Sequence, residues 1–277
     1  MHPGLRWLAL AALVTGCDDS REIVADNPDP SETTLSCDGG HRLERLAGSV
    51  AGTNGQPLAG AHAQACLRKG DGVSLCLSPV TADAEGAFVI EIPAEHGCVA
   101  HAAVRVVADD SRPALYCPLG ETLWQTLSRP LVLPSVPPAV SLPGGPETEA
   151  RAAVFDDGLT VDIVPAQLAP GTTYADLRAV RTTFDPRCVP GSFEGVYAFS
   201  PEVSLDGAFS LSIPNTTKLP AGTEVDLLVQ GGLACLPGDL DEGTLTSIGT
   251  ATVSADGQRI DAGPVLPCLG WLAYRRH

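Results

Sequence analysis

Hydrophobic and polar residues alternate along much of the chain, in short runs that are separated by turn residues. A period of two sends successive side chains to opposite faces of a sheet, which is typical of strands that bury one face. The runs lie at 46–52, 61–69, 73–77, 87–93, 159–164, 205–214, 223–229 and 246–253. Helical spacing occurs only at Leu119, Leu123 and Leu127, so the pattern predicts an all-β fold.

Proline interrupts this pattern between Ser128 and Arg151, where six prolines and a Gly-Gly pair occur. Because proline donates no hydrogen bond to a neighbouring strand, this segment is predicted to be a stiff linker at a domain boundary. We therefore predict two β-sandwich domains, at 37–130 and 151–277, joined by a Pro-rich linker at 131–150. One larger sandwich with a proline-rich excursion is the alternative.

The beginning of the chain carries a different pattern. Arg6 is followed by an apolar run at 7–14, which is too short to span a bilayer as a helix but matches the apolar core of a signal peptide. The sequence VTGC at 14–17 follows, with a small residue directly before the cysteine. This order resembles the lipobox of bacterial lipoproteins. The resemblance implies cleavage between Gly16 and Cys17 and attachment of a lipid to Cys17.

Residues 1–16 are therefore predicted to be a signal peptide, and residues 17–36 a lipidated, acidic and flexible tether. Acyl chains contribute about 0.8 kcal/mol for each buried CH₂, so two or three of them anchor a protein stably. We expect an anchor on the extracytoplasmic side of a bacterial cell envelope, facing the periplasm or the surface. An ordinary signal peptide with an unrelated cysteine is the alternative.

A tight hairpin is predicted at the Gly-Asp-Gly sequence at 70–72, between two alternating runs. A three-residue loop whose last glycine is left-handed places Lys69 opposite Val73. In that register Cys66 faces Cys76, and facing residues of antiparallel strands lie within disulfide distance. We therefore predict a disulfide between these two cysteines.

The chain has nine cysteines, and lipidation of Cys17 leaves eight, an even number in an exported protein. Disulfides are the expected state of such cysteines. Apart from the hairpin pair, three cysteines lie in each half, which requires either one bridge between the halves or two free thiols. The pairs expected from sequence order are Cys98–Cys117, Cys188–Cys235 and Cys37–Cys268.

The first half contains turn and strand signals in a characteristic order. An alternating run at 46–52 is followed by GQPLAGA at 55–61, and TADAEGAF at 81–88 leads into a second alternating run. This order resembles the carboxypeptidase regulatory-like domain, a transthyretin- or Ig-like β-sandwich, over residues 46–93. The family usually continues with a glycine-tyrosine strand, whereas this chain has Cys98 there.

The second half repeats part of this order. LDGAFSLSIP at 205–214 parallels EGAFVIEIP at 85–93, so we predict a second β-sandwich. In metallocarboxypeptidases the regulatory-like domain follows a zinc-binding catalytic domain, and no part of this sequence corresponds to one. Since a fold does not determine an activity, the resemblance implies no peptidase.

Sequence motifs for catalysis are missing. There is no HExxH, no Ser-x-x-Lys and no phosphate-binding glycine loop, and 48–52 has the residue types of a nucleophile elbow in the wrong spacing. His96 and His101, with Glu91 or Glu95, offer a metal or acid–base site as the alternative to histidines in loops around a disulfide. We predict no enzyme, no metal and no cofactor. The acidic stretch at 239–242 lacks the ligand spacing of a calcium loop.

The formal net charge of −16 limits the classes of binding partner, since it repels phosphate backbones and anionic lipid surfaces. We therefore expect no nucleic-acid binding. The function predicted is a non-catalytic structural or protein-binding module at the membrane, held there by its N-terminal lipid. A glycan-binding module and an accessory subunit of an envelope enzyme are the alternatives. A glycan surface requires exposed aromatic residues, and Trp271 and Tyr274 are the first candidates among Trp124, Trp271, Tyr116, Tyr174, Tyr197 and Tyr274. The alternative for these two residues, which is the more common one, is a place in a sandwich core or a last strand.

Overall fold

The computed structural model describes residues 36–109, 111–138, 144–155, 157–172, 174–235 and 241–277. About half of these residues lie in strands and very few in helical turns, which confirms the all-β prediction. The helical elements there are two single turns, η1 (Pro165–Gln167) and η2 (Tyr174–Asp176). In this part of the chain we find no helix with the length and apolar character that a bilayer crossing requires.

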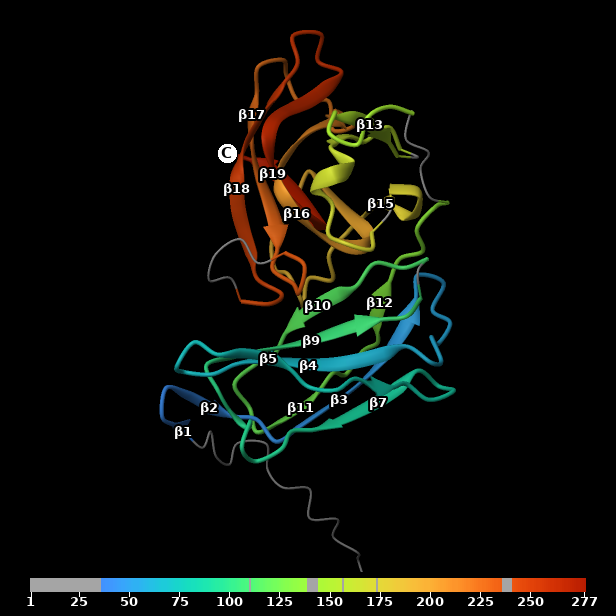
Figure 1. The fold of residues 1–277 in the computed structure, drawn as a ribbon. Helices are drawn as coiled ribbons and strands as arrows, with labels where there is room; N and C mark the ends of the chain where they lie inside the picture. Colours follow the sequence, from blue (N-terminus) through green and yellow to red (C-terminus); the bar gives the residue numbers. More distant parts are fainter. Residues whose placement is uncertain (1–35, 110, 139–143, 156, 173, 236–240) are drawn as a thin grey trace, which may run out of the picture. The chain divides into compact units, whose positions relative to one another are not determined.

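Two stacked sheets form the first half, and β4 and β9 lie over β3 and β7 in Figure 1. The lower sheet has β3 (Arg45–Gly52) at its centre, paired with β7 (Ala87–Glu91), β11 (Trp124–Thr126) and β12 (Leu131–Leu133). The upper sheet has the order β10 (Leu115–Pro118), β9 (His101–Val107), β4 (His62–Arg68) and β5 (Ser74–Cys76), and β6 (Val80–Thr81) also pairs with β4. A small third sheet contains β1 (Ser36–Cys37), β2 (Gly40–Arg42) and β8 (Cys98–Val99).

The core of the first half lies between the two large sheets. Alternate residues of each strand enter it, as the period of two predicts. Leu46, Phe88 and Ile90 enter from the lower sheet, and Ala65 and Val104 enter from the upper sheet. All of them are buried, so this half is a β-sandwich.

The segment with helical leucine spacing is a strand, and the helix compatible with that spacing is wrong. β11 pairs in parallel with β3, with Trp124 opposite Arg45. The backbone N–H of Leu127 continues this pairing by donating to the carbonyl of Ala47 at 2.9 Å, and the Leu127 side chain packs against the core. Pairing with a distant strand therefore overrides the local periodicity.

The first three residues of the segment predicted as a linker belong to this sheet. β12 pairs in parallel with β3, and Leu131 and Leu133 are buried in the core. Pro134 follows at once and ends the strand, since it has no backbone N–H to donate.

One sheet forms the second half, in the order β13 (Arg151–Val154), β14 (Thr160–Ile163), β16 (Gly195–Pro214), β19 (Arg259–Arg276), β17 (Glu224–Gln230) and β18 (Leu245–Val253), with β15 (Arg178–Thr182) on β16. β16 and β19 bend where their register shifts. β18 pairs with β17 and again with β19, so the sheet curls around its own core. Phe199, Phe209, Leu227 and Tyr274 lie in this core.

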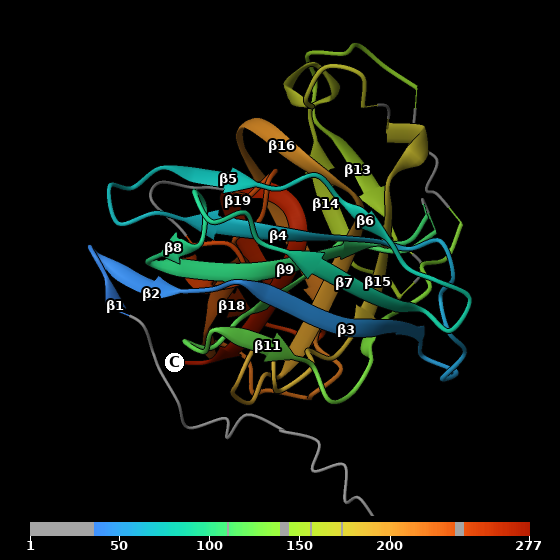
Figure 2. The same cartoon turned by 90° about the horizontal axis from the view of Figure 1, so that it is seen from below.

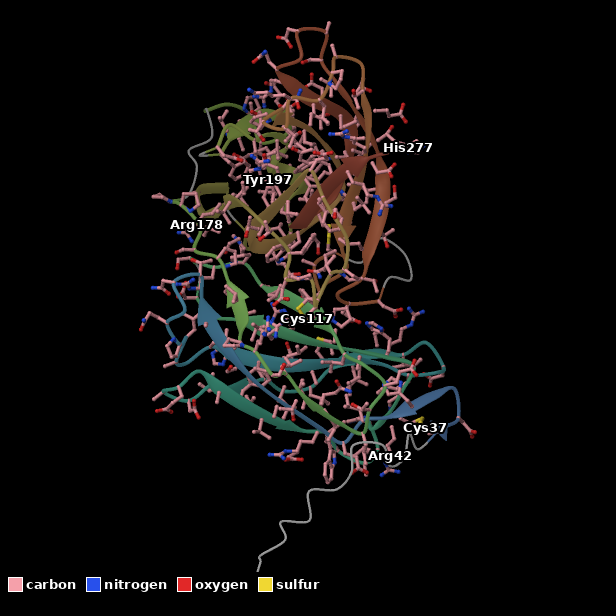
Figure 3. All side chains as sticks on the ribbon, turned by 180° about the vertical axis from the view of Figure 1, so that it is seen from behind. Cys37, Arg42, Cys117, Arg178, Tyr197 and His277 are labelled. Carbon is pink, nitrogen blue, oxygen red and sulfur yellow. A yellow bond between two sulfur atoms is a disulfide. The ribbon has the colours of Figure 1, made fainter. Side chains whose placement is uncertain are left out.

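The two halves are in direct contact, and residues 33–277 form one compact unit. Trp271 of the second half belongs to the hydrophobic cluster of the first half, together with Leu115. A disulfide between Cys117 and Cys188 joins the halves covalently, with Cα atoms 4.3 Å apart (Figure 3). Three cysteines remain in each half apart from the hairpin pair, which requires either such a bridge or two free thiols.

The Cys66–Cys76 disulfide lies in the hairpin where the sequence places it. The register has Cys66 opposite Cys76, and their Cα atoms are 4.0 Å apart. The backbone N–H of Lys69 donates to the carbonyl oxygen of Val73 at 2.8 Å, and Gly72 has a φ of 86°. The loop type therefore fixes the register, as expected for a three-residue hairpin.

The other three predicted pairs are wrong. The structure has Cys37–Cys98, Cys117–Cys188 and Cys235–Cys268 in place of Cys98–Cys117, Cys188–Cys235 and Cys37–Cys268. Long-range strand pairing places β1 and β8 in the same small sheet, where the Cα atoms of Cys37 and Cys98 are 5.9 Å apart. Four disulfides indicate that the protein folds in an oxidising compartment outside the cytoplasm.

Candidate binding surface

The predicted lipidation site cannot be located in the fold. Gly16 and Cys17 lie outside the described residues, as do the signal peptide and nearly all of the tether. Cleavage between these two residues and lipidation of Cys17 stay predictions.

His101 and Glu91, two of the residues that offered a metal or acid–base site, have separate partners, whereas Nδ1 of His96 is buried without a hydrogen-bond partner. His101 Nε2 lies 2.8 Å from the backbone carbonyl oxygen of Glu242, and Glu91 forms an ion pair with Arg45 at 3.1 Å. Asp241 pairs with Arg68 at 2.7 Å, while Asp239 lies outside the described residues. In the described part of the chain no three His, Cys, Asp or Glu side chains gather as metal ligands would.

Trp271 and Tyr274, the first candidates for a glycan surface, lie in the core, so the core alternative is the correct one for both. Their exposed fractions are 3% and 0%. β19 is an inner strand of its sheet, and Trp271 Nε1 donates to the carbonyl oxygen of Ala114 at 2.6 Å. The ring of Phe184 stacks on Trp271, with centroids 5.2 Å apart. Both side chains therefore serve packing.

Trp124 is exposed, with 56% of its surface accessible, whereas the side chain of Tyr174 lies outside those that the structure describes. Trp124 lies on the short edge strand β11, and its pairing partner on β3 is Arg45. Tyr116 and Tyr197 are buried, with exposed fractions of 2% and 0%. The sequence did not single out Trp124, because the leucine spacing around it is compatible with a helix.

The outward side of the lower sheet presents Trp124 together with other exposed side chains. Figure 2 shows β7, β3 and β11 side by side on the near face. Alternation along β3 sends Leu46 and Val50 inward, so the intervening residues face outward. We call this surface the Trp124 face, and it contains Arg45, Ala47 and Ser49 of β3, Val89 and Glu91 of β7, Trp124 and Thr126 of β11, and Val132 of β12.

Hydrogen bonds hold the turn before β11. Thr122 Oγ1 donates to the carbonyl oxygen of Trp124 at 3.1 Å, and Gln125 Nε2 donates to the carbonyl oxygen of Gly120 at 3.1 Å. Gln125 also bonds the hydroxyl of Thr122. The backbone that carries Trp124 is thereby fixed from both sides, which reduces the entropy lost when a ligand binds.

A second polar cluster lies between the two halves. Glu202 Oε2 accepts hydrogen bonds from the Tyr116 hydroxyl at 3.0 Å and from Arg105 at 3.3 Å. The Tyr116 hydroxyl also accepts from the backbone N–H of Leu233 at 2.8 Å. Burial raises the pKa of the Glu202 carboxyl above its ordinary value of 4.5, although Arg105 opposes this effect. The cluster joins β9 and β10 of the first half to β16 of the second half and to the turn at Leu233.

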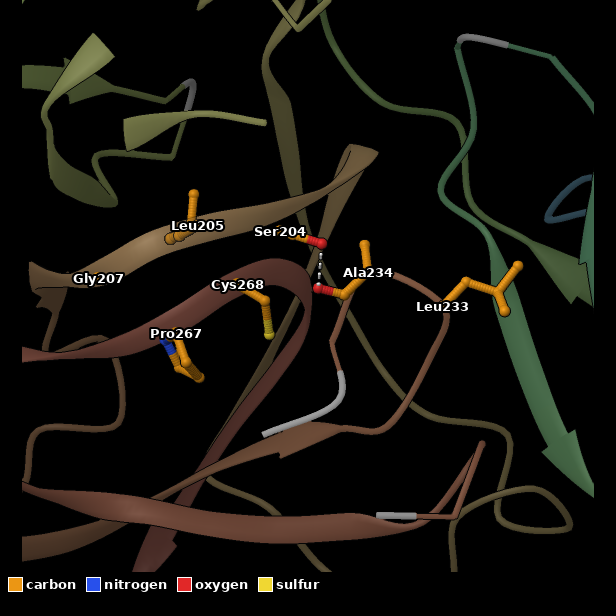
Figure 4. A pocket seen from close by; sticks show the side chains of 7 residues that line it. All are labelled: Ser204, Leu205, Gly207, Leu233, Ala234, Pro267 and Cys268. Atoms are coloured by element: carbon orange, nitrogen blue, oxygen red, sulfur yellow. Dashed lines mark hydrogen bonds between the residues drawn. The ribbon is translucent and has the colours of Figure 1, made fainter. Parts of the chain in front are cut away.

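The two best-formed pockets are shallow and carry little chemistry. One of about 290 Å³ lies beside the turn that holds Leu233, and Ser204 Oγ there donates to the carbonyl oxygen of Ala234 at 3.1 Å (Figure 4). The other, of about 340 Å³, lies where the halves meet, with Phe193 and Leu245 in its wall and Arg275 as its charged residue. Arg275 pairs with Asp226 at 3.6 Å.

The sequence was also compared with known proteins, and it matches neither a model of a known protein family nor a curated protein.

Proposed function

We propose that this protein is a bacterial lipoprotein of the cell envelope that acts as a non-catalytic binding module. The lipobox-like sequence at 14–17 supports lipidation of Cys17, and the four disulfides agree with maturation outside the cytoplasm. In this proposal the first sandwich is a carboxypeptidase regulatory-like domain, on the order of turns and strands at 46–93.

The observation that carries the binding role is the Trp124 face. A tryptophan with 56% exposure is unusual on a protein with few aromatic residues, and it lies on a rigid sheet rather than on a free loop. Exposed apolar side chains that gather on one surface mark interaction sites. The acyl anchor keeps this surface close to the membrane, where the partner is an envelope component.

Substitution of the lipidated residue tests the anchor. Cys17→Ala should abolish incorporation of an alkyne-tagged fatty acid in the native host, and should shift the protein from the membrane fraction to the soluble fraction or stop its processing. The physical reason is the loss of the acyl chains, whose burial supplies the membrane affinity. Labelling and fractionation of cells that produce each variant measure both effects.

Asp18→Ala is the matched control, because it changes the neighbouring residue and keeps the cysteine. This variant should still take the label. Fatty-acid label on the Cys17→Ala protein, or undiminished membrane retention of that variant after its signal peptide has been removed, would contradict the proposed anchor.

A further inference from the structure

Exposed apolar side chains concentrate on the Trp124 face. The described residues contain six large hydrophobic side chains that are exposed, and Val89, Trp124 and Val132 all belong to this face. Their exposed fractions are 44%, 56% and 40%. Between them β3 contributes small outward side chains, Ala47 and Ser49 among them, so the face has a flat middle and larger side chains at its edges.

The size of the face limits what it binds. β3 has eight residues, which gives a length of about 26 Å, and three strands span about 14 Å. The resulting area of about 400 Å² is half of the roughly 800 Å² that each partner buries in a stable protein complex. A second copy of the chain or a folded protein partner needs more surface, whereas an extended chain of small units does not.

The charges on and beside the face limit the partner further. Arg45 and Glu91 pair at 3.1 Å and neutralise each other, while Glu121 is exposed close to Trp124 in the sequence. The whole chain has a formal net charge of −16. Polyanions and anionic lipid surfaces are therefore repelled, and an uncharged partner is favoured.

The chemical groups of the face fit a sugar. A pyranose ring has C–H groups on its two sides, which stack on the indole ring of a tryptophan, and hydroxyls around its rim. Arg45 donates hydrogen bonds, Glu91 accepts them, and the Thr126 hydroxyl does both. All three lie on the same side of the sheet as Trp124.

We infer that the Trp124 face binds a neutral polysaccharide, with a sugar ring stacked on Trp124 and its hydroxyls bonded by Arg45, Glu91 and Thr126. The glycan chain runs along β3 over Ala47 and Ser49. This inference rests on the proposed binding function and names the partner of the same module.

Affinity electrophoresis of the mature full-length protein in mild detergent tests the inference. Non-denaturing gels contain laminarin, galactomannan or dextran as neutral probes, and alginate as the anionic probe. Retardation by at least one neutral polysaccharide is expected. Trp124→Ala should weaken the affinity for that polysaccharide by about tenfold or more, as expected for removal of a central aromatic contact. Trp124→Phe keeps an aromatic ring and should retain part of the affinity.

Val154→Ala is the matched control, because Val154 has a similar exposed fraction, 58%, and lies on β13 of the other half. The Val154→Ala protein should be retarded as much as the wild type. Absence of retardation by all three neutral polysaccharides, equal retardation of the Trp124→Ala protein, or stronger retardation by alginate would overturn the inference.

Two further outcomes would replace the glycan with another occupant. Light scattering that shows a dimer of the wild type and a monomer of Trp124→Ala would assign the face to a second copy. Co-sedimentation with phosphatidylcholine vesicles that Trp124→Ala abolishes, for lipid-free protein carrying Cys17→Ala, would assign it to the membrane. The anchor is tested through Cys17 alone, so failure of the glycan inference is distinguishable from failure of the proposed lipoprotein.

Discussion

Glu202 places a buried carboxyl group in the contact between the two halves. Its side chain is 10% exposed, and it accepts hydrogen bonds from two residues of the first half. Gly232 lies so close that a Cβ there would come within 2.5 Å of Glu202 Oε1. A charge in this position loses its hydration, and only Arg105 and the hydrogen bonds compensate.

The raised pKa of Glu202 has a defined consequence for stability. Because the folded state holds the Glu202 proton more tightly than the unfolded state, this residue's contribution is fully present below the ordinary pKa of 4.5 and is lost as the pH rises through the raised value. Glu202→Gln cannot titrate, so its unfolding free energy relative to wild type should increase with pH. The increase should appear between about pH 4.5 and about pH 8.

Urea denaturation of both proteins at the two pH values measures this difference. Glu85→Gln removes one carboxylate from an exposed turn and serves as the control for the change in net charge. A difference between Glu202→Gln and wild type that is the same at both pH values would contradict the role assigned to burial.

At the scale of elements, the disulfides differ in what they join. Cys66–Cys76 closes a hairpin with a sequence separation of 10, whereas Cys117–Cys188 joins the two halves with a separation of 71. A longer closed loop removes more entropy from the unfolded chain. The bridge between the halves should therefore stabilise the protein more than the hairpin bridge does.

Paired alanine substitutions test this ranking. Cys117→Ala with Cys188→Ala should lower the unfolding free energy by about 4 kcal/mol, and Cys66→Ala with Cys76→Ala by about 3 kcal/mol. Chemical denaturation of the two double variants gives both values. A larger loss for the hairpin pair would show that loop length does not govern their contributions.

Local features of the fold could be predicted from the sequence, and long-range ones could not. Lys69 and Val73 flank a short loop whose type fixes the register, so the Cys66–Cys76 pair follows from neighbouring residues alone. Cys37 meets Cys98 in the small sheet of β1, β2 and β8, and no local signal in the sequence indicates that these strands pair.

In the candidate surface, too, local features could be predicted from the sequence and long-range ones could not. Alternation identified β3 and β7 and their inward residues, including Phe88. Whether an aromatic residue is exposed depends on the place of its strand in a sheet, and that place is a long-range property. Trp271 lies on an inner strand and is buried, whereas Trp124 lies on an edge strand and is exposed.

At the scale of the whole molecule, the proposed lipoprotein and the proposed glycan binding both depend on where the protein is located in the cell. Residues 33–277 form one compact unit with four disulfides, and the face proposed for glycan binding lies on its first half. The charge of −16 repels anionic surfaces, so the proposed anchor relies on acyl chains rather than on electrostatic attraction.

The mass of the mature N-terminal peptide, measured on protein purified from its native host, tests the central claim most directly. The account predicts a chain that begins at Cys17 and carries the added mass of a diacylglycerol, with or without a further acyl group. A chain that retains Met1, or one that begins with an unmodified residue, would contradict the claim that this is a lipoprotein.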